Sequence, residues 1–146
     1  MYEIDMVNDC YSKLTNIESL KTVILEVPYM SRCIDMVIVD DLDNIITIEF
    51  KLKNWQQAFL QAKDHSMGAD EAYICIPRPK RISSKLIEES DKTGVGVLFW
   101  NPEGEFPFEQ FNTAKVNPNR WQPWVSSLKT RVNRISGEHI FKEIPS

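Results

Sequence analysis

Two β-branched stretches joined by a short turn are the feature that most constrains the fold of this chain. Residues 33–40 (CIDMVIVD) and residues 45–52 (IITIEFKL) are rich in isoleucine and valine, as strands are. Residues 41–44 (DLDN), which lie between them, are turn-forming. The two stretches are therefore predicted to form an antiparallel β-hairpin.

The length of the loop decides which residues of this hairpin face each other. A loop of three or five residues centred on Leu42 places Asp35 directly opposite Glu49, with their Cβ atoms about 4.5–5.5 Å apart. A loop of two or four residues would break this opposition. Lys51 follows Glu49 by two positions and so shares its face. Two carboxylates and an ammonium are thus expected near one end of a sheet whose other face is apolar.

Facing carboxylates repel each other, and burial strengthens the repulsion. A bound divalent cation would relieve it, and oxygen ligands favour Mg²⁺ or Mn²⁺ over Zn²⁺. A lysine beside such a cation can position an attacking water and stabilise negative charge that develops on a phosphate. The same residues also fit a buried ion pair of Asp35 or Glu49 with Lys51, or a charged hairpin face that is open to solvent.

The rest of the chain alternates between helical and strand-like patterns. The expected elements are a helix over 2–14, a strand over 22–27 ended by Pro28, a helix over 55–66 with Asn54 as its N-cap, a strand over 71–76, a helix over 83–91, a strand over 95–100, a loop or short edge hairpin over 102–118 and a helix over 119–136. This order predicts an α/β fold with a central mixed sheet of about five strands and helices on both faces.

The chain carries a pattern that resembles the signature of the PD-(D/E)xK nuclease superfamily: Asp35, thirteen intervening residues, and then Glu49-Phe50-Lys51. The resemblance covers about residues 1–100 and is nearest to small prokaryotic members related to Holliday-junction resolvases. It implies a restriction-endonuclease-like three-layer fold. We accordingly expect a single domain over residues 1–146, with its core in 1–100 and a C-terminal loop and helix in 101–146.

The resemblance also implies roles for particular residues. Asp35, Glu49 and the backbone carbonyl of Phe50 would hold Mg²⁺ or Mn²⁺, and Lys51 would act on the attacking water. The third carboxylate would be Glu3, which lies on the apolar stripe of the first expected helix, or Glu26 in the first expected strand.

One clade of the family carries a Gln-x-x-x-Tyr motif on the helix after the lysine. Gln61 matches the first position of this motif, whereas His65 stands in place of the tyrosine. That departure puts the DNA-contact role of the clade in doubt for this chain. Gln61 remains a candidate site residue, and His65 is interpreted as a polar residue on the surface of its helix.

Charge is unevenly distributed along the chain. The net charge is -4 and the isoelectric point is about 5.2, so a global basic footprint for nucleic acid is absent. Residues 1–49 are acidic overall, and residues 115–146 are basic overall. The candidate contacts to DNA phosphates come from a basic loop and from the last helix: Arg78, Lys80, Arg81, Lys85, Arg131 and Arg134.

Several functional classes are disfavoured by composition. No apolar run is long enough to span a membrane, and the acidic first residues do not resemble a signal peptide. Three widely spaced cysteines are typical of reduced thiols in a cytoplasmic protein. The sequence thus predicts a cytoplasmic, Mg²⁺-dependent nuclease acting on DNA, as a homodimer or as an accessory subunit of a larger complex. The alternative is a non-catalytic module on the same fold that binds nucleic acid or protein.

Overall fold

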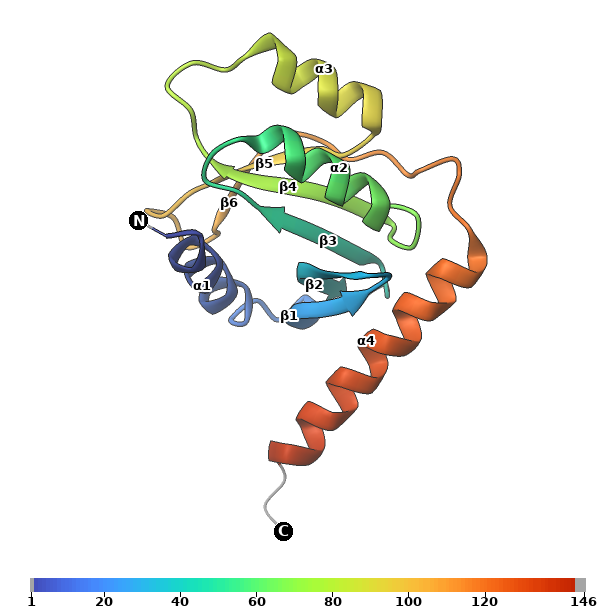
Figure 1. Ribbon diagram of the computed structural model, residues 1–146. Coiled ribbons are helices and arrows are strands. Elements are labelled where there is room, and N and C mark those ends of the chain that lie inside the picture. Colours follow the sequence, from blue (N-terminus) through green and yellow to red (C-terminus); the bar gives the residue numbers. More distant parts are fainter. Residues whose placement is uncertain (1, 144–146) are drawn as a thin grey trace.

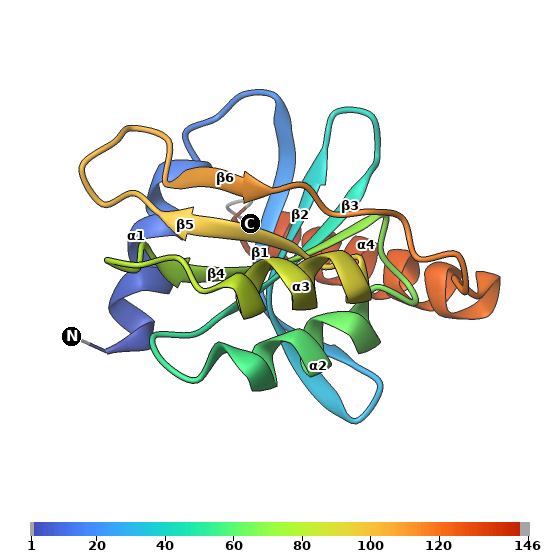
Figure 2. The same ribbon diagram turned by 90° about the horizontal axis from the view of Figure 1, so that it is seen from above.

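A six-stranded mixed sheet forms the centre of the molecule (Figures 1 and 2). The computed structural model describes the backbone of residues 2–143 and the side chains of residues 2–136. The elements are α1 (Glu3–Leu14), β1 (Leu20–Tyr29), β2 (Arg32–Asp40), β3 (Ile45–Phe50), α2 (Trp55–His65), β4 (Glu71–Pro77), α3 (Ser84–Thr93), β5 (Gly96–Trp100), β6 (Phe108–Asn112) and α4 (Gln122–Glu143). None of the helices among the described residues is both long enough and apolar enough to cross a membrane.

The strands lie in the sheet in their order along the chain. β1, β2 and β3 form an antiparallel meander, β3, β4 and β5 run parallel, and β6 returns antiparallel to β5. The parallel strands require crossovers, which α2 and α3 supply. Figure 1 shows α1 on one side of the sheet and α2 and α3 on the other, with α4 passing beside β1.

Three apolar clusters fill the spaces between these layers. One joins α1 to residues such as Met36, Ile48 and Cys75 of the sheet. A second joins α2 and α3 to β4 and β5, and a third places Leu128 and Val132 of α4 against β1 and β2. Helices on both faces of a mixed sheet confirm the predicted fold class, and the arrangement is compatible with a three-layer restriction-endonuclease-like fold.

The register of the β2–β3 hairpin is the one that an odd loop predicts. Met36 pairs with Ile48 and Val39 with Ile45, and the Asp40 N–H donates to the Asn44 carbonyl across the turn. The Asp40 carboxylate accepts hydrogen bonds from the turn N–H groups and thereby stabilises a loop of three residues. Extending this register by one pair brings Asp35 opposite Glu49.

Three local predictions need correction. β1 continues through Pro28 to Tyr29, because β1 is an edge strand and Pro28 need not donate to a further strand. Asn54 stands at the N-cap of α2 but has a left-handed backbone (φ 57°) and makes no side-chain capping bond. The segment after β5 forms the edge hairpin that was one of the two alternatives, and its strand β6 gives the sheet six strands instead of about five.

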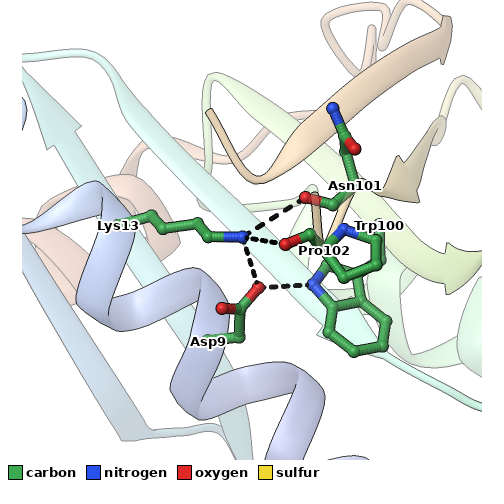
Figure 3. Close-up of polar contacts among 5 residues, drawn as sticks. All are labelled: Asp9, Lys13, Trp100, Asn101 and Pro102. Carbon is green, nitrogen blue, oxygen red and sulfur yellow. Dashed lines mark hydrogen bonds and ion pairs between the residues drawn. The ribbon is translucent and has the colours of Figure 1, made fainter. Parts of the chain in front are cut away.

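A polar clamp ties α1 to the end of β5 (Figure 3). The Asp9 carboxylate accepts hydrogen bonds from the Lys13 ammonium and the Trp100 indole N–H, both at 2.8 Å, and Lys13 also donates to the carbonyl of Pro102. Burial acts to raise the pKa of Asp9, but the bonds from Lys13 and Trp100 outweigh it and hold this pKa below its usual value. The clamp holds α1 against the sheet edge at which β5 ends.

Candidate functional site

Asp35 and Glu49 lie where β2 and β3 separate. The last paired residues before the gap are Met36 and Ile48. Beyond them, each carboxylate accepts a hydrogen bond from the backbone of the other strand: the Asp35 N–H donates to Glu49 Oε1 at 3.2 Å, and the Phe50 N–H donates to Asp35 Oδ2 at 2.9 Å. Side chains therefore replace the ladder bonds, and the two carboxyl groups are brought together.

This arrangement is electrostatically unfavourable for Asp35. Desolvation by burial and, after it, the charge of Glu49 raise the pKa of Asp35 to about 7, and the charge of Glu3 adds to the shift. The hydrogen bond from the Phe50 N–H opposes the shift but does not cancel it. Asp35 therefore attracts a proton or a cation near neutral pH.

A hollow of about 410 Å³ opens beside Asp35. Glu3 from α1, Glu26 from β1 and Phe50 from β3 line it together with Asp35. Glu3 is held in place by its Oε1, which accepts a hydrogen bond from the Leu52 N–H at 3.1 Å. Glu3 and Glu26 both border the hollow and are therefore both candidates for a third carboxylate.

Glu26 occupies an unusual backbone position. Its φ of 53° is left-handed, which is costly for a residue with a Cβ, and it lies between the pairs that flank Asp35 in the β1–β2 register. Strain of this kind in the middle of a strand is found most often near functional sites. No sequence pattern signals it.

Glu49 is more enclosed than the hairpin pattern predicts. It is 4% exposed, and its Oε1 lies 3.1 Å from Nδ1 of His65 at the end of α2. The interpretation of His65 as a surface residue is wrong, since its side chain is only 1% exposed. The signal that could have found it is the apolar stripe of α2, because His65 lies three residues after Ala62 and seven after Ala58, both buried.

Among the described residues, Lys51 and Gln61 make no side-chain hydrogen bond or ion pair with the carboxylates. Lys51 is half-buried, and its N–H donates to the Cys75 carbonyl, which continues the pairing of β3 with β4. Within the described part of the chain its ammonium makes no ion pair or hydrogen bond. Gln61 is half-buried beside the packed face of α2 and likewise has no hydrogen-bond partner there.

The basic residues fall into two separate regions. Lys80, Arg81 and Lys85 are exposed in and after the loop that follows β4, at the sheet edge where the parallel strand β3 also ends. Arg78 belongs to the same loop but is paired with Glu109 and lies over the ring of Phe99. The Arg78 side chain is therefore partly engaged in contacts within the protein.

Arg131 and Arg134 are exposed on α4, which packs against β1 and β2 rather than at the edge where β3 and β4 end. The basic loop, and not the last helix, therefore lies at the same end of the sheet as Lys51, which directly follows β3.

The described residues contain no cluster of three or more histidine, cysteine, aspartate or glutamate side chains already arranged to hold a metal ion. Asp35, Glu3 and Glu26 face one hollow, whereas Glu49 is directed toward the Asp35 N–H and His65. The carboxylates are gathered but do not form a completed ligand set.

No protein-family model matches this sequence. No curated protein matches it either. Among solved structures, a protein of unknown function from Silicibacter pomeroyi is similar over 99% of this chain and 97% of its own, with 14% identity and a TM-score of 0.58. A repair endonuclease from Pyrococcus abyssi is similar over 70% of this chain, with 20% identity and a TM-score of 0.56. The match covers 48% of that endonuclease, so this chain corresponds to about half of it. At these identities the comparisons establish a shared fold.

Proposed function

We propose that this chain is a metal-dependent nuclease that hydrolyses phosphodiester bonds in DNA. The observation that carries the proposal is the direct opposition of Asp35 and Glu49 at the end of a hairpin, with Lys51 directly after the end of β3. A hollow lined by Glu3, Glu26 and Asp35 lies beside this pair, and an exposed basic loop lies at the same sheet edge. The likeness of fold to a repair endonuclease is in keeping with this assignment.

The donor set suits a hard divalent cation. The polar side chains that line the hollow are all carboxylates, those of Glu3, Glu26 and Asp35, and oxygen ligands favour Mg²⁺ or Mn²⁺. Burial first, and the charge of Glu49 after it, raise the pKa of Asp35, and a bound cation would offset both effects by stabilising the ionised carboxylate. Asp35, Glu49, the Phe50 carbonyl and either Glu3 or Glu26 would hold the ion, which would polarise the scissile phosphate and acidify a bound water.

The other residues act through charge and position. Lys51 has no partner for its ammonium among the described residues, so that ammonium is available to orient the attacking water and to offset charge that develops on the phosphate. Lys80, Arg81 and Lys85 would contact flanking phosphates, which gives affinity without sequence preference.

The chain offers a matched pair of lysines to test this function. Lys51→Ala should lower Mg²⁺-dependent cleavage of duplex, flap or four-way-junction DNA by about 10²–10⁴-fold, with little change in DNA affinity. Lys53→Ala, at an exposed position two residues further on, should cleave like wild type. Absence of metal-dependent cleavage by wild type on these substrates, on single-stranded DNA and on RNA would refute the nuclease proposal. Equal cleavage by Lys51→Ala and wild type would refute the role of Lys51.

A second candidate is a non-catalytic nucleic-acid-binding or protein-interaction module. The observation that favours it is the engagement of Glu49 with the Asp35 N–H and His65, without a completed cluster of metal ligands among the described residues. A measurement of DNA binding in EDTA distinguishes the two kinds of module. A nucleic-acid-binding module would retain a salt-sensitive affinity for DNA, whereas a protein-interaction module would not bind DNA.

A further inference from the structure

His65 is a buried, titratable side chain that the proposed mechanism does not use. Its side chain is 1% exposed, and its ring packs edge-on against that of Tyr29, with centroids 6.3 Å apart. Tyr29 is itself buried and donates to the Trp124 carbonyl at 3.4 Å. The imidazole is therefore held by packing on one side and approaches Glu49 on the other.

The polar atoms of His65 are incompletely satisfied. Nδ1 lies 3.1 Å from Glu49 Oε1, but neither ring nitrogen completes a hydrogen bond within the described residues. A buried polar group without a partner costs about 1–3 kcal/mol. A phenylalanine or leucine on this apolar stripe would avoid that cost.

Two donors approach the same oxygen of Glu49. The Asp35 N–H reaches Oε1 at 3.2 Å, and His65 Nδ1 approaches it from α2 at 3.1 Å. Carboxylates that bind metal ions are commonly oriented by such outer hydrogen bonds, and loss of the outer partner typically weakens metal binding about 10–100-fold. With Oε1 occupied, Oε2 is the oxygen left for a cation.

We propose that His65 is a positioning residue that donates from Nδ1 to Glu49 Oε1 and thereby directs Oε2 toward the divalent cation. This role rests on the proposed function, because it assigns Glu49 to a metal ion. The proton on Nδ1 makes His65 a donor to Glu49 and excludes it as a ligand through that nitrogen.

The first test needs no metal. Nitrogen-15 spectra of the histidine rings report which nitrogen carries the proton, and the only other histidine, His139, is distinguished by recording His65→Phe. We expect the His65 proton on Nδ1, and we expect Glu49→Gln to shift that signal while Lys63→Ala, an exposed change on α2, leaves it in place. A proton on Nε2, or an Nδ1 signal that does not respond to Glu49→Gln, would overturn the proposal.

The second test measures Mn²⁺ binding by calorimetry. His65→Phe preserves an aromatic ring beside Tyr29 but removes the donor, and should weaken Mn²⁺ binding about 10–100-fold. His65→Asn places an amide near the position of Nδ1 and should restore affinity to within a few-fold of wild type, with Lys63→Ala unchanged. Any cleavage lost in His65→Phe should return at high Mn²⁺, which a purely structural defect would not allow.

The two proposals fail in different ways. Equal Mn²⁺ affinity of wild type and His65→Phe would overturn the role of His65 and leave the proposed nuclease intact. A wild-type chain that binds no Mn²⁺ would refute the proposed function and, with it, any role of His65 toward a cation. Melting curves for each variant establish that the compared proteins are folded.

Discussion

Removing the charge of Asp35 should stabilise the metal-free protein. In Asp35→Asn the amide oxygen can still accept from the Phe50 N–H, and the amide N–H₂ can donate to Glu49, so the contacts stay while the repulsion disappears. A pKa raised from 3.8 to about 7 corresponds to at most roughly 4 kcal/mol of destabilisation when Asp35 is ionised. Because Asp35 is partly exposed and solvent screens its interactions, about 2 kcal/mol is the expected gain.

The difference in stability between Asp35→Asn and wild type should depend on pH. The folded state binds the Asp35 proton more tightly than the unfolded state does, so the penalty is absent below about pH 4, grows as the pH rises and is complete above about pH 7. In EDTA at pH 8 the variant should therefore melt roughly 4–8 °C above wild type, and at pH 4 the two should coincide.

The assay is thermal unfolding of both proteins from pH 4 to pH 8, with Asp64→Asn as the control because Asp64 is exposed on α2. The control should show no such trend. A variant that melts at or below the wild-type temperature at pH 8, or a difference that does not change with pH, would refute the argument that Asp35 is held in a repulsive, desolvated position.

Three further predictions concern the scaffold. Asp9→Ala leaves the Trp100 indole N–H without its acceptor and should lower the free energy of unfolding in urea by about 1–2 kcal/mol at neutral pH. Because the folded state lowers the pKa of Asp9, this difference should shrink as the pH falls below the usual aspartate range. Gly96→Ala would place a Cβ 2.3 Å from the ring of Tyr73 and should cost about 1–3 kcal/mol; an unchanged urea midpoint would contradict that contact. Cys33 is the exposed thiol of three, so a thiol reagent should modify one cysteine in the native protein and all three after unfolding.

Much of the fold could be predicted because its signals are local. The hairpin register follows from alternation of side chains and from an odd loop, both of which lie within residues 33–52. The helices and parallel strands follow from apolar periodicity and from turn residues such as Gly94, whose positive φ ends α3. Element ends were less predictable, since β1 runs past Pro28 only because no further strand pairs with it.

The candidate site was only partly predictable, for a physical reason. A strand assigns each side chain to one of two faces, so the opposition of Asp35 and Glu49 follows from pairing alone. A helix distributes its side chains around a circle, and those that flank the apolar stripe are buried or exposed according to what packs there. His65 is such a residue, and its burial depends on Tyr29 and Glu49, which come from two other elements.

The sequence by itself determined the two strands of the hairpin and the alternation that can set two carboxylates opposite each other ahead of a lysine, whereas the three-residue loop that makes them oppose is a finding of the structure. Only the tertiary structure decided that Glu3 reaches Leu52 from a clamped α1, that Glu26 adopts a left-handed backbone beside Asp35 and that His65 turns inward to Glu49. Pairing between neighbouring strands is set over a few residues of chain. Desolvation and charge, which raise the pKa of Asp35, arise only when segments far apart in the sequence pack around one point.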